Sequence, residues 1–294
     1  MTAWFAALPG TVRGLFWMFM QAVFFAAMAA VVHYLGTAMS VFEVVFFRYF
    51  FGLVVMVPWF LRVGPAALRV PRPRMVLLRN MTVFLAVLVW FAALARLPIS
   101  DAIALQFTLP LFVVLGAALF LRETVGWRRW AAVGVGFAGA MIILRPGFVE
   151  VSVPMLLVLL SAVIYAAAHL LTKVVSRDVS PPFLVFHMNL AMLPLAFIFA
   201  LPAWVMPGWA DAPWLIALGV FSTLAHMFLT RAYAAADASF VEPMDFARLP
   251  LSALYGWLLF RQTSDAWTWA GAAIIFCAVV YNTRYETRRR KPAA

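Results

Sequence analysis

Long apolar stretches alternate with short polar connections along almost the whole chain. Each stretch runs without the period-two alternation of a membrane β-strand for roughly twenty residues, the length that an α-helix needs to cross a bilayer. The pattern predicts ten such helices, near residues 15–35, 41–61, 75–95, 99–121, 127–144, 152–173, 181–202, 212–235, 239–260 and 266–283. The connections are too short to form a soluble domain. We therefore expect one all-α integral membrane domain.

One part of the pattern occurs twice. Residues 99–130 are echoed by residues 235–270, with Pro110 matching Pro250 after a four-residue insertion in the second copy. Internal repeats of this kind are typical of secondary transporters. The sequence therefore predicts two five-helix repeats, residues 1–147 and 148–294.

The basic residues predict how the chain lies in the membrane. With both termini in the cytoplasm, sixteen Lys and Arg residues fall on the cytoplasmic side, and only Arg96, Arg145 and Arg261 fall on the other. This is the positive-inside pattern, so the net charge of +11 needs no nucleic acid as a partner. Five helices per half give the halves opposite orientations, which is an inverted repeat. We expect a multi-pass protein of the cytoplasmic membrane.

Several kinds of chemistry find no support in the sequence. The single cysteine, Cys277, excludes a disulfide framework, and the four histidines lie on separate predicted helices without a short metal-ligand spacing. The glycine motif at 134–139 lies inside an apolar helix rather than after a strand, and no ATP-binding GxxxxGK[ST] loop is present. We expect no metal and no cofactor, and energy from a gradient or a partner.

Ionisable groups within the predicted helices are the best candidates for function. Each costs about 2.5–3.5 kcal/mol at mid-bilayer, so each should face protein or water. In the ninth helix Glu242, Asp245, Arg248 and Ser252 follow at steps of three, three and four, which places them on one face. Asp245 and Arg248 can neutralise one another and leave Glu242 facing a polar cavity. The spacing fits both a structural ion pair and direct substrate contact.

Two further polar stripes follow helical spacing. The eighth helix carries Thr223, His226, Thr230, Tyr233 and Asp237, and the sixth carries Ser161, Tyr165 and His169. Polar groups that recur on one face of an apolar helix point inward, because lipid cannot satisfy their hydrogen bonds. Each stripe is expected either to line a solvated pathway or to bond one helix to another.

Three more positions are predicted to matter. Arg48 lies deep in the second helix and is a candidate for an anion-attracting pocket. Pro110 and Pro250 occupy matching positions in the two repeats, and each removes a backbone hydrogen bond. Paired helix breaks indicate a binding or gating site in repeat transporters.

The whole chain resembles the EamA-type transporters of the drug/metabolite transporter superfamily. The resemblance rests on short patterns spread along the chain: Phe47-Arg48-Tyr49, Leu97-Pro98 to Asp101-Ala102, Pro110, Arg145-Pro146-Gly147, Ser161 to Tyr165, Arg231-Ala232-Tyr233, Ala236-Asp237-Ala238 and Glu242-Pro243 to Leu249-Pro250. The family often has a Gly-Glu pair after the fourth and ninth helices. This chain has Arg122-Glu123 and Arg261-Gln262 there, so the second acidic residue is absent.

The resemblance implies ten helices in two inverted repeats and transport of a small organic solute, with export the expected direction. The hypothesis is a secondary active transporter, not an enzyme, that moves an amino-acid-like, carboxylate-bearing or other amphipathic metabolite by alternating access. The alternatives are a receptor or scaffold that transports nothing and, less favoured, an integral membrane enzyme. The oligomeric state is not predicted.

The hypothesis gives each candidate residue a role. Arg48 and Arg248 would attract an anionic group on the substrate. Glu242 or Asp245 would pair with a cationic group or carry a coupling proton. The remaining candidates orient the ligand or line its pathway: Tyr165, His169, His226 and Tyr233.

Overall fold

The computed structural model describes residues 8–120, 127–145, 151–175, 178–235 and 242–290, and this part of the chain is helical without a β-strand. The α-helices are α2 (Gly10–Leu35), α3 (Val41–Val63), α4 (Pro73–Leu94), α5 (Ile99–Gln106), α6 (Leu109–Phe120), α7 (Trp127–Leu144), α8 (Val153–Val175), α9 (Pro181–Ala200), α10 (Ala212–Ala235), α12 (Arg248–Phe260) and α13 (Ala266–Arg290). Three short 3₁₀ helices accompany them: η1 (Gly64–Leu68), η2 (Leu201–Ala203) and η3 (Glu242–Ala247).

Many of these helices have the length and composition of membrane spans. Within the described ranges, six are long and apolar enough to cross a bilayer: α2, α3 with η1, α4, α8, α9 with η2, and α10. Shorter apolar helices cover Ile99–Val113, Gly134–Leu144 and Ala266–Ala278. The described residues of every predicted range are therefore mainly helical, although only six of the described helices meet the combined criterion of length and apolar composition.

The fourth predicted helix is interrupted close to Pro110, where the sequence predicts a helix break. It consists of α5 and α6, separated at Phe107 and Thr108. The amides of these two residues bond three positions back, to Ala104 and Leu105, and the Thr108 hydroxyl also donates to Leu105 O at 2.8 Å. Pro110 has no N–H and disfavours helical backbone before it, which explains a break at this point.

The ninth predicted helix also differs from a single α-helix. Its first part is the 3₁₀ helix η3, and α-helix begins only at Arg248, while residues 236–241 lie outside the described residues. Pro250 then occupies the first turn of α12, where the missing N–H has no intrahelical partner to lose. Both interruptions thus lie two or three residues before the matching prolines.

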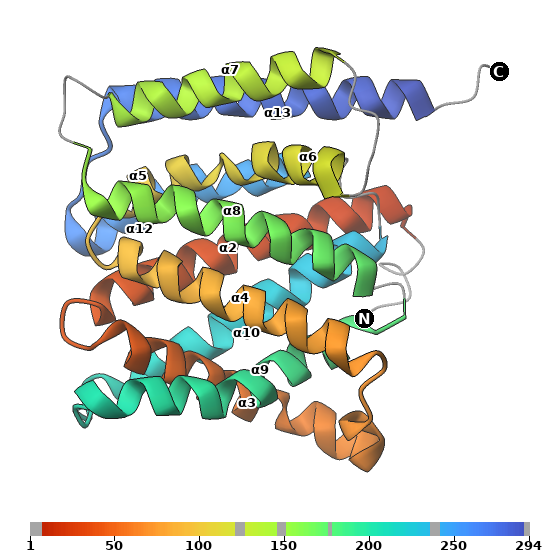
Figure 1. Cartoon of the computed structure of the whole chain (residues 1–294). Helices are drawn as coiled ribbons and strands as arrows, with labels where there is room; N and C mark the ends of the chain where they lie inside the picture. The colour runs from red at the N-terminus through yellow and green to blue at the C-terminus, as the bar shows by residue number, and fades with distance from the viewer. Residues whose placement is uncertain (1–7, 121–126, 146–150, 176–177, 236–241, 291–294) are drawn as a thin grey trace.

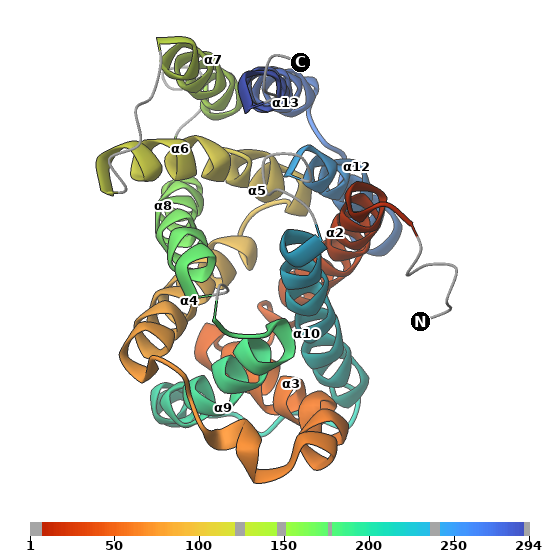
Figure 2. The same cartoon turned by 90° about the vertical axis from the view of Figure 1, so that its right-hand side faces the viewer.

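The helices pack in layers (Figures 1 and 2). α7 lies along α13 at one end of the molecule, followed by a layer of α5, α6 and α12. α2 packs against α10, and α4 packs against α8, in the middle. α3 lies against α9 and α10 at the opposite end. Helices that are distant in sequence therefore form the interior.

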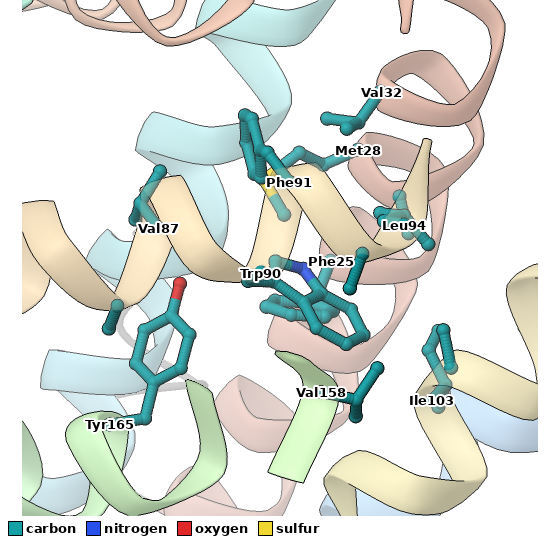
Figure 3. Packing of buried hydrophobic residues seen from close by; sticks show 14 of the residues in the cluster. Phe25, Met28, Val32, Val87, Trp90, Phe91, Leu94, Ile103, Val158 and Tyr165 are labelled. Atoms are coloured by element: carbon teal, nitrogen blue, oxygen red, sulfur yellow. The ribbon is translucent and has the colours of Figure 1, made fainter. Parts of the chain in front are cut away.

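The main core lies between α2, α4, α5 and α8. Trp90 is fully buried there, with its ring 6.3 Å from that of Phe25. Met28, Phe91 and Ile103 belong to the same cluster (Figure 3). At its edge Tyr165 directs its hydroxyl toward α4 (Figure 3). The edge of the core at Tyr165 therefore adjoins the candidate site residues.

Glycine allows α3 and α10 to approach each other closely. A Cβ atom added at Gly219 would lie 2.2 Å from Phe51 Cβ and 2.8 Å from the backbone nitrogen of Gly52. Backbone and Cβ atoms cannot move aside without shifting a helix. In a membrane, where helices gain no hydrophobic energy by associating, such small residues determine which helices meet.

Replacing Gly219 with valine is therefore expected to destabilise the fold. Overpacking of this kind costs about 1–3 kcal/mol or more, because α3 and α10 must separate. The thermal midpoint of the detergent-purified protein should fall by several degrees. Gly134→Val is the matched control, since a Cβ at Gly134 meets no atom within 4 Å. Equal midpoints for the two variants would contradict the prediction.

Candidate functional site

Arg48 on α3 is the most deeply buried charged candidate. Its residue is 1% exposed, and its guanidinium carbon lies 4.6 Å from the centre of the Tyr49 ring. Tyr49 in turn stacks on Phe84 of α4, at 6.0 Å between ring centres. The Nε and Nη1 atoms of Arg48 are buried and make no hydrogen bond to the described chain. Arg48 therefore presents unused donors inside the protein.

Polar groups from α9 and α10 meet α3 one turn beyond Arg48. A Cβ at Gly52 would lie 2.9 Å from Thr223 Oγ1 and 3.0 Å from Asn189 Nδ2. Arg48 and Gly52 are four residues apart, so they lie on the same face of α3. Asn189 and Thr223 are buried, and these two polar atoms make no hydrogen bond to the described residues. The junction of α3, α9 and α10 thus gathers several buried donors.

The predicted residues of the sixth and eighth helices lie beside this junction. The His169 ring is 6.4 Å from both Tyr165 on its own helix and Tyr233 on α10. His226 Nδ1 donates to Ser222 O at 3.1 Å, and His226 interacts electrostatically with both Arg48 and His169. The structure therefore brings these five predicted residues into one region.

Asp245 and Arg248 form the ion pair that their spacing allows, between Asp245 Oδ2 and Arg248 Nη2. The pair is nearly buried at the junction of η3 and α12. The Arg248 guanidinium also lies over Phe25, at 4.4 Å, and near Phe107, at 5.8 Å. A cation on an aromatic face is stabilised when water is excluded. Arg248 is thus held by the protein itself.

Other predicted positions are only partly described. Glu242 begins η3, but its side chain lies outside the described residues, as does all of Asp237. The backbone of Pro110 lies in α6 and that of Pro250 in α12, next to the two interruptions.

The polar stripes contain residues with structural roles. Ser161 is fully buried, and its hydroxyl lies 3.0 Å from Gln106 Oε1 of α5 and 2.7 Å from Val158 O of its own helix. Thr230 donates to His226 O of its own helix at 2.9 Å. Ser161 therefore has a polar partner on another helix as well as on its own, whereas Thr230 is satisfied within its own helix.

Arg79 on α4 is a charged residue that the sequence analysis missed. It is 3% exposed, and its Nε donates to Thr172 Oγ1 of α8 at 3.0 Å, while Nη1 donates to Asn80 Oδ1 at 3.1 Å. It interacts electrostatically with Tyr49 and Arg48. The sequence could have pointed to it. When the basic residues are assigned to the two sides of the membrane, three of the 22 remain within predicted helices: Arg48, Arg79 and Arg248.

Gln262 connects segments that are far apart in sequence. Its Oε1 accepts from the amide of Ile99 at 3.1 Å, and its Nε2 lies 2.8 Å from His33 Nε2. The other ring nitrogen of His33 lies 2.9 Å from Leu94 O. The amide that stands in place of the family's second acidic residue therefore joins α2, the start of α5 and the end of α12.

Substituting leucine for Gln262 is expected to weaken this junction. The Ile99 amide would lose its acceptor inside the protein, at a cost of about 1–3 kcal/mol. The thermal midpoint in detergent should fall, whereas Gln262→Glu keeps an acceptor and should fall less. The prediction fails if the leucine variant is as stable as the wild type.

No group of three or more His, Cys, Asp or Glu residues that could hold a metal ion is found in the part of the chain that the structure describes. The described site therefore consists of arginine, histidine, tyrosine, hydroxyl and amide groups. Such groups bind solutes through hydrogen bonds, charge and ring contacts.

Comparison with known proteins places the chain in a family. Residues 12–145 and 152–284 both match the model of the EamA-like transporter family. The chain belongs to this family, and with it to the drug/metabolite transporter superfamily.

Named relatives extend over almost the full length. A riboflavin transporter of Rhizobium johnstonii is 38% identical, covering 96% of this chain and 95% of the relative, and one of Vibrio cholerae is 36% identical, covering 95% of each. An S-adenosylmethionine uptake transporter of Rickettsia prowazekii is 28% identical over 94% of each. A solved crystal structure at 20% identity covers 96% of this chain and 99% of its own, with a TM-score of 0.68, and supports the fold.

These findings confirm the predicted class. The chain is a multi-pass membrane protein of a transporter family and not an enzyme. The predicted resemblance to EamA-type transporters is likewise confirmed.

Proposed function

We propose that this protein is a secondary active transporter of riboflavin, or of another heterocyclic metabolite of similar size. The observation that carries the proposal is the similarity to riboflavin transporters over nearly the whole chain. Three relatives with that name are 38%, 36% and 32% identical. Relatives named for S-adenosylmethionine uptake are 28–29% identical, and a pseudopaline exporter of Pseudomonas aeruginosa is 31% identical.

The candidate site supports a substrate with a flat ring and a polar edge. Tyr165, His169 and Tyr233 supply aromatic faces that would orient the ring. Arg48 and Asn189 supply buried donors that suit ring carbonyl oxygens. We place His226 on the wall of the same pathway, since it interacts electrostatically with Arg48.

We further propose that the chain works as two inverted five-helix repeats, residues 1–147 and 148–294. The packing pattern supports this. The predicted helices of the two halves correspond in order, so that α2 corresponds to α8, α4 to α10 and α6 to α12. Under this exchange the α2–α10 contact becomes α8–α4, and the α12–α2 contact becomes α6–α8. α3–α9 and α7–α13 each map onto themselves.

Alternating access then requires movement of one repeat against the other around the site. Pro110 and Pro250, beside the two helix interruptions, are the proposed points of bending. The positive-inside distribution supports a cytoplasmic membrane location with both termini in the cytoplasm. Because Asp245 pairs with Arg248, we assign the coupling proton first to Glu242.

Counterflow in liposomes tests the proposed function. Purified protein would be reconstituted and assayed with labelled riboflavin, S-adenosylmethionine, amino acids and carboxylates, in both directions and with or without a proton gradient. Saturable riboflavin flux is the expected result, and dependence on the gradient would support proton coupling. The assay of flux from the inside to the outside tests export, the direction that the family resemblance implies.

Two results would contradict the proposal. Saturable flux of a different solute class, without riboflavin flux, would support a transporter function but rule out riboflavin as the substrate. Tight riboflavin binding by folded protein without any flux would favour a receptor instead.

A further inference from the structure

Four basic side chains come together inside the protein, and we name them the basic cluster: Arg48 of α3, Arg79 of α4, His169 of α8 and His226 of α10. His226 interacts electrostatically with the other three, and Arg79 interacts with Arg48 and His169. The two arginines are 1% and 3% exposed. Two guanidinium groups that interact electrostatically with each other are therefore both buried away from water.

No described carboxylate compensates these charges. Each of the six described acidic side chains bonds elsewhere: Glu43 to the amides of Ser40 and Val205, Asp101 to Thr268, Asp178 to Arg72, Asp211 to the amide of Gly208, Asp245 to Arg248 and Asp265 to Arg145. The described hydrogen-bond partners of Arg79, Thr172 and Asn80, are neutral. The Nε and Nη1 atoms of Arg48 bond to nothing in the described chain.

Such an arrangement is unfavourable in the empty protein. A guanidinium group does not lose its proton in proteins, so it cannot escape burial by becoming neutral. An unpaired buried charge costs several kcal/mol, and a second like charge nearby raises that cost. An anion between the arginines would replace the repulsion by two attractive charge-assisted contacts.

We propose that Arg48 and Arg79 form a binding site for an anionic group, which is either a small inorganic anion or an acidic group of the transported solute. Tyr49 lies against Arg48 and interacts with its guanidinium group, so its ring forms part of the wall beside this arginine. The sequence predicts this role for Arg48 together with Arg248. We assign it to Arg48 and Arg79 instead, because Asp245 already neutralises Arg248. Since riboflavin is neutral, the anion site goes beyond the proposed function, with which it shares Arg48.

Ligand binding to the purified, full-length protein tests the site. The probes are sodium chloride and sodium phosphate added to a gluconate buffer, and the matched pair riboflavin and flavin mononucleotide, which differ only by a phosphate. The readouts are the thermal midpoint and quenching of flavin fluorescence. Arg48→Gln and Arg79→Gln remove the two charges. Arg96→Gln is the control, because Arg96 is exposed and bonds to its own helix at Ala92 O.

The wild type and the Arg96 variant are expected to gain thermal stability with an inorganic anion, or to bind flavin mononucleotide about tenfold more tightly than riboflavin. The first response identifies an inorganic anion, and the second identifies an acidic group on the solute. Both should disappear in the two glutamine variants. If Arg79→Gln does not fold, Arg79→Lys keeps the charge without the planar fork and should keep a weakened response.

Two outcomes would overturn the inference: no probe has an effect on the wild type, or the effect persists in Arg48→Gln and Arg79→Gln. Riboflavin binding without any anion response would reject the site and leave the proposed function standing. An anion response without riboflavin binding would support the site and count against riboflavin as the substrate.

Discussion

Replacement of Arg48 by methionine is expected to abolish solute counterflow while leaving the protein at least as stable as the wild type. Methionine keeps much of the volume of the side chain but removes the buried charge. Two charge-assisted donors would be lost from the site, which should lower flux by roughly 100-fold or more. The substitution takes a buried charge out of the interior, and none of the described carboxylates loses a partner, which is the reason to expect no loss of stability. Flux in liposomes and the thermal midpoint in detergent check the two halves of the prediction.

A loss of flux without a loss of thermal stability would distinguish a substrate-binding role of Arg48 from a structural one. A residue that only holds helices together would lose stability and flux together when replaced. Arg96→Met, at an exposed position, should change neither quantity. Wild-type flux in the Arg48 variant, together with the same result for Glu242→Gln, would remove both residues from the transport site.

Asparagine at Asp245 is expected to destabilise the fold strongly. It removes the carboxylate from a nearly buried ion pair and leaves the Arg248 charge between Phe25 and Phe107. Removing one partner of such a pair typically costs about 3–5 kcal/mol. The thermal midpoint and the yield of monodisperse protein should both fall sharply.

The double variant Asp245→Leu with Arg248→Met tests the cause. If the loss of the Asp245 carboxylate from the ion pair is responsible, removing both partners should recover most of the lost stability. A double variant as unstable as Asp245→Asn would show that shape or other bonds at this junction matter more than the charge.

Much of the fold was predictable because lipid imposes a simple rule on sequence. Every backbone group in the bilayer must bond within its own segment, so apolar length alone locates helices. The described residues of the predicted ranges are therefore mainly helical. The backbone conformation at the interruptions was harder to predict. Pro110 and Pro250 lie next to the interruptions, but whether the chain there is α-helix, turn or 3₁₀ helix depends on the helices packed around it.

The site was predictable to a smaller degree, and the reason is distance in sequence. The Asp245–Arg248 pair follows from a spacing of three residues. The bond from Gln262 to the Ile99 amide spans 163 residues, and the one from Arg79 to Thr172 spans 93. No periodicity encodes such pairs. Arg79 lies in the second turn of α4, near the end of a predicted span, where an arginine is usually an interfacial anchor, so its burial depends on the approach of α8.

The Asp245–Arg248 pair also bears on how the chain is inserted during synthesis. An aspartate or an arginine in a segment entering the bilayer costs about 2.5–3.5 kcal/mol each at its centre. These two residues are three positions apart, so they can neutralise each other within the nascent segment, before any other helix has arrived. Arg48 and Arg79 have no such local carboxylate. Their segments must therefore enter the membrane on apolar length alone, and the charges can be sheltered only once the helices assemble.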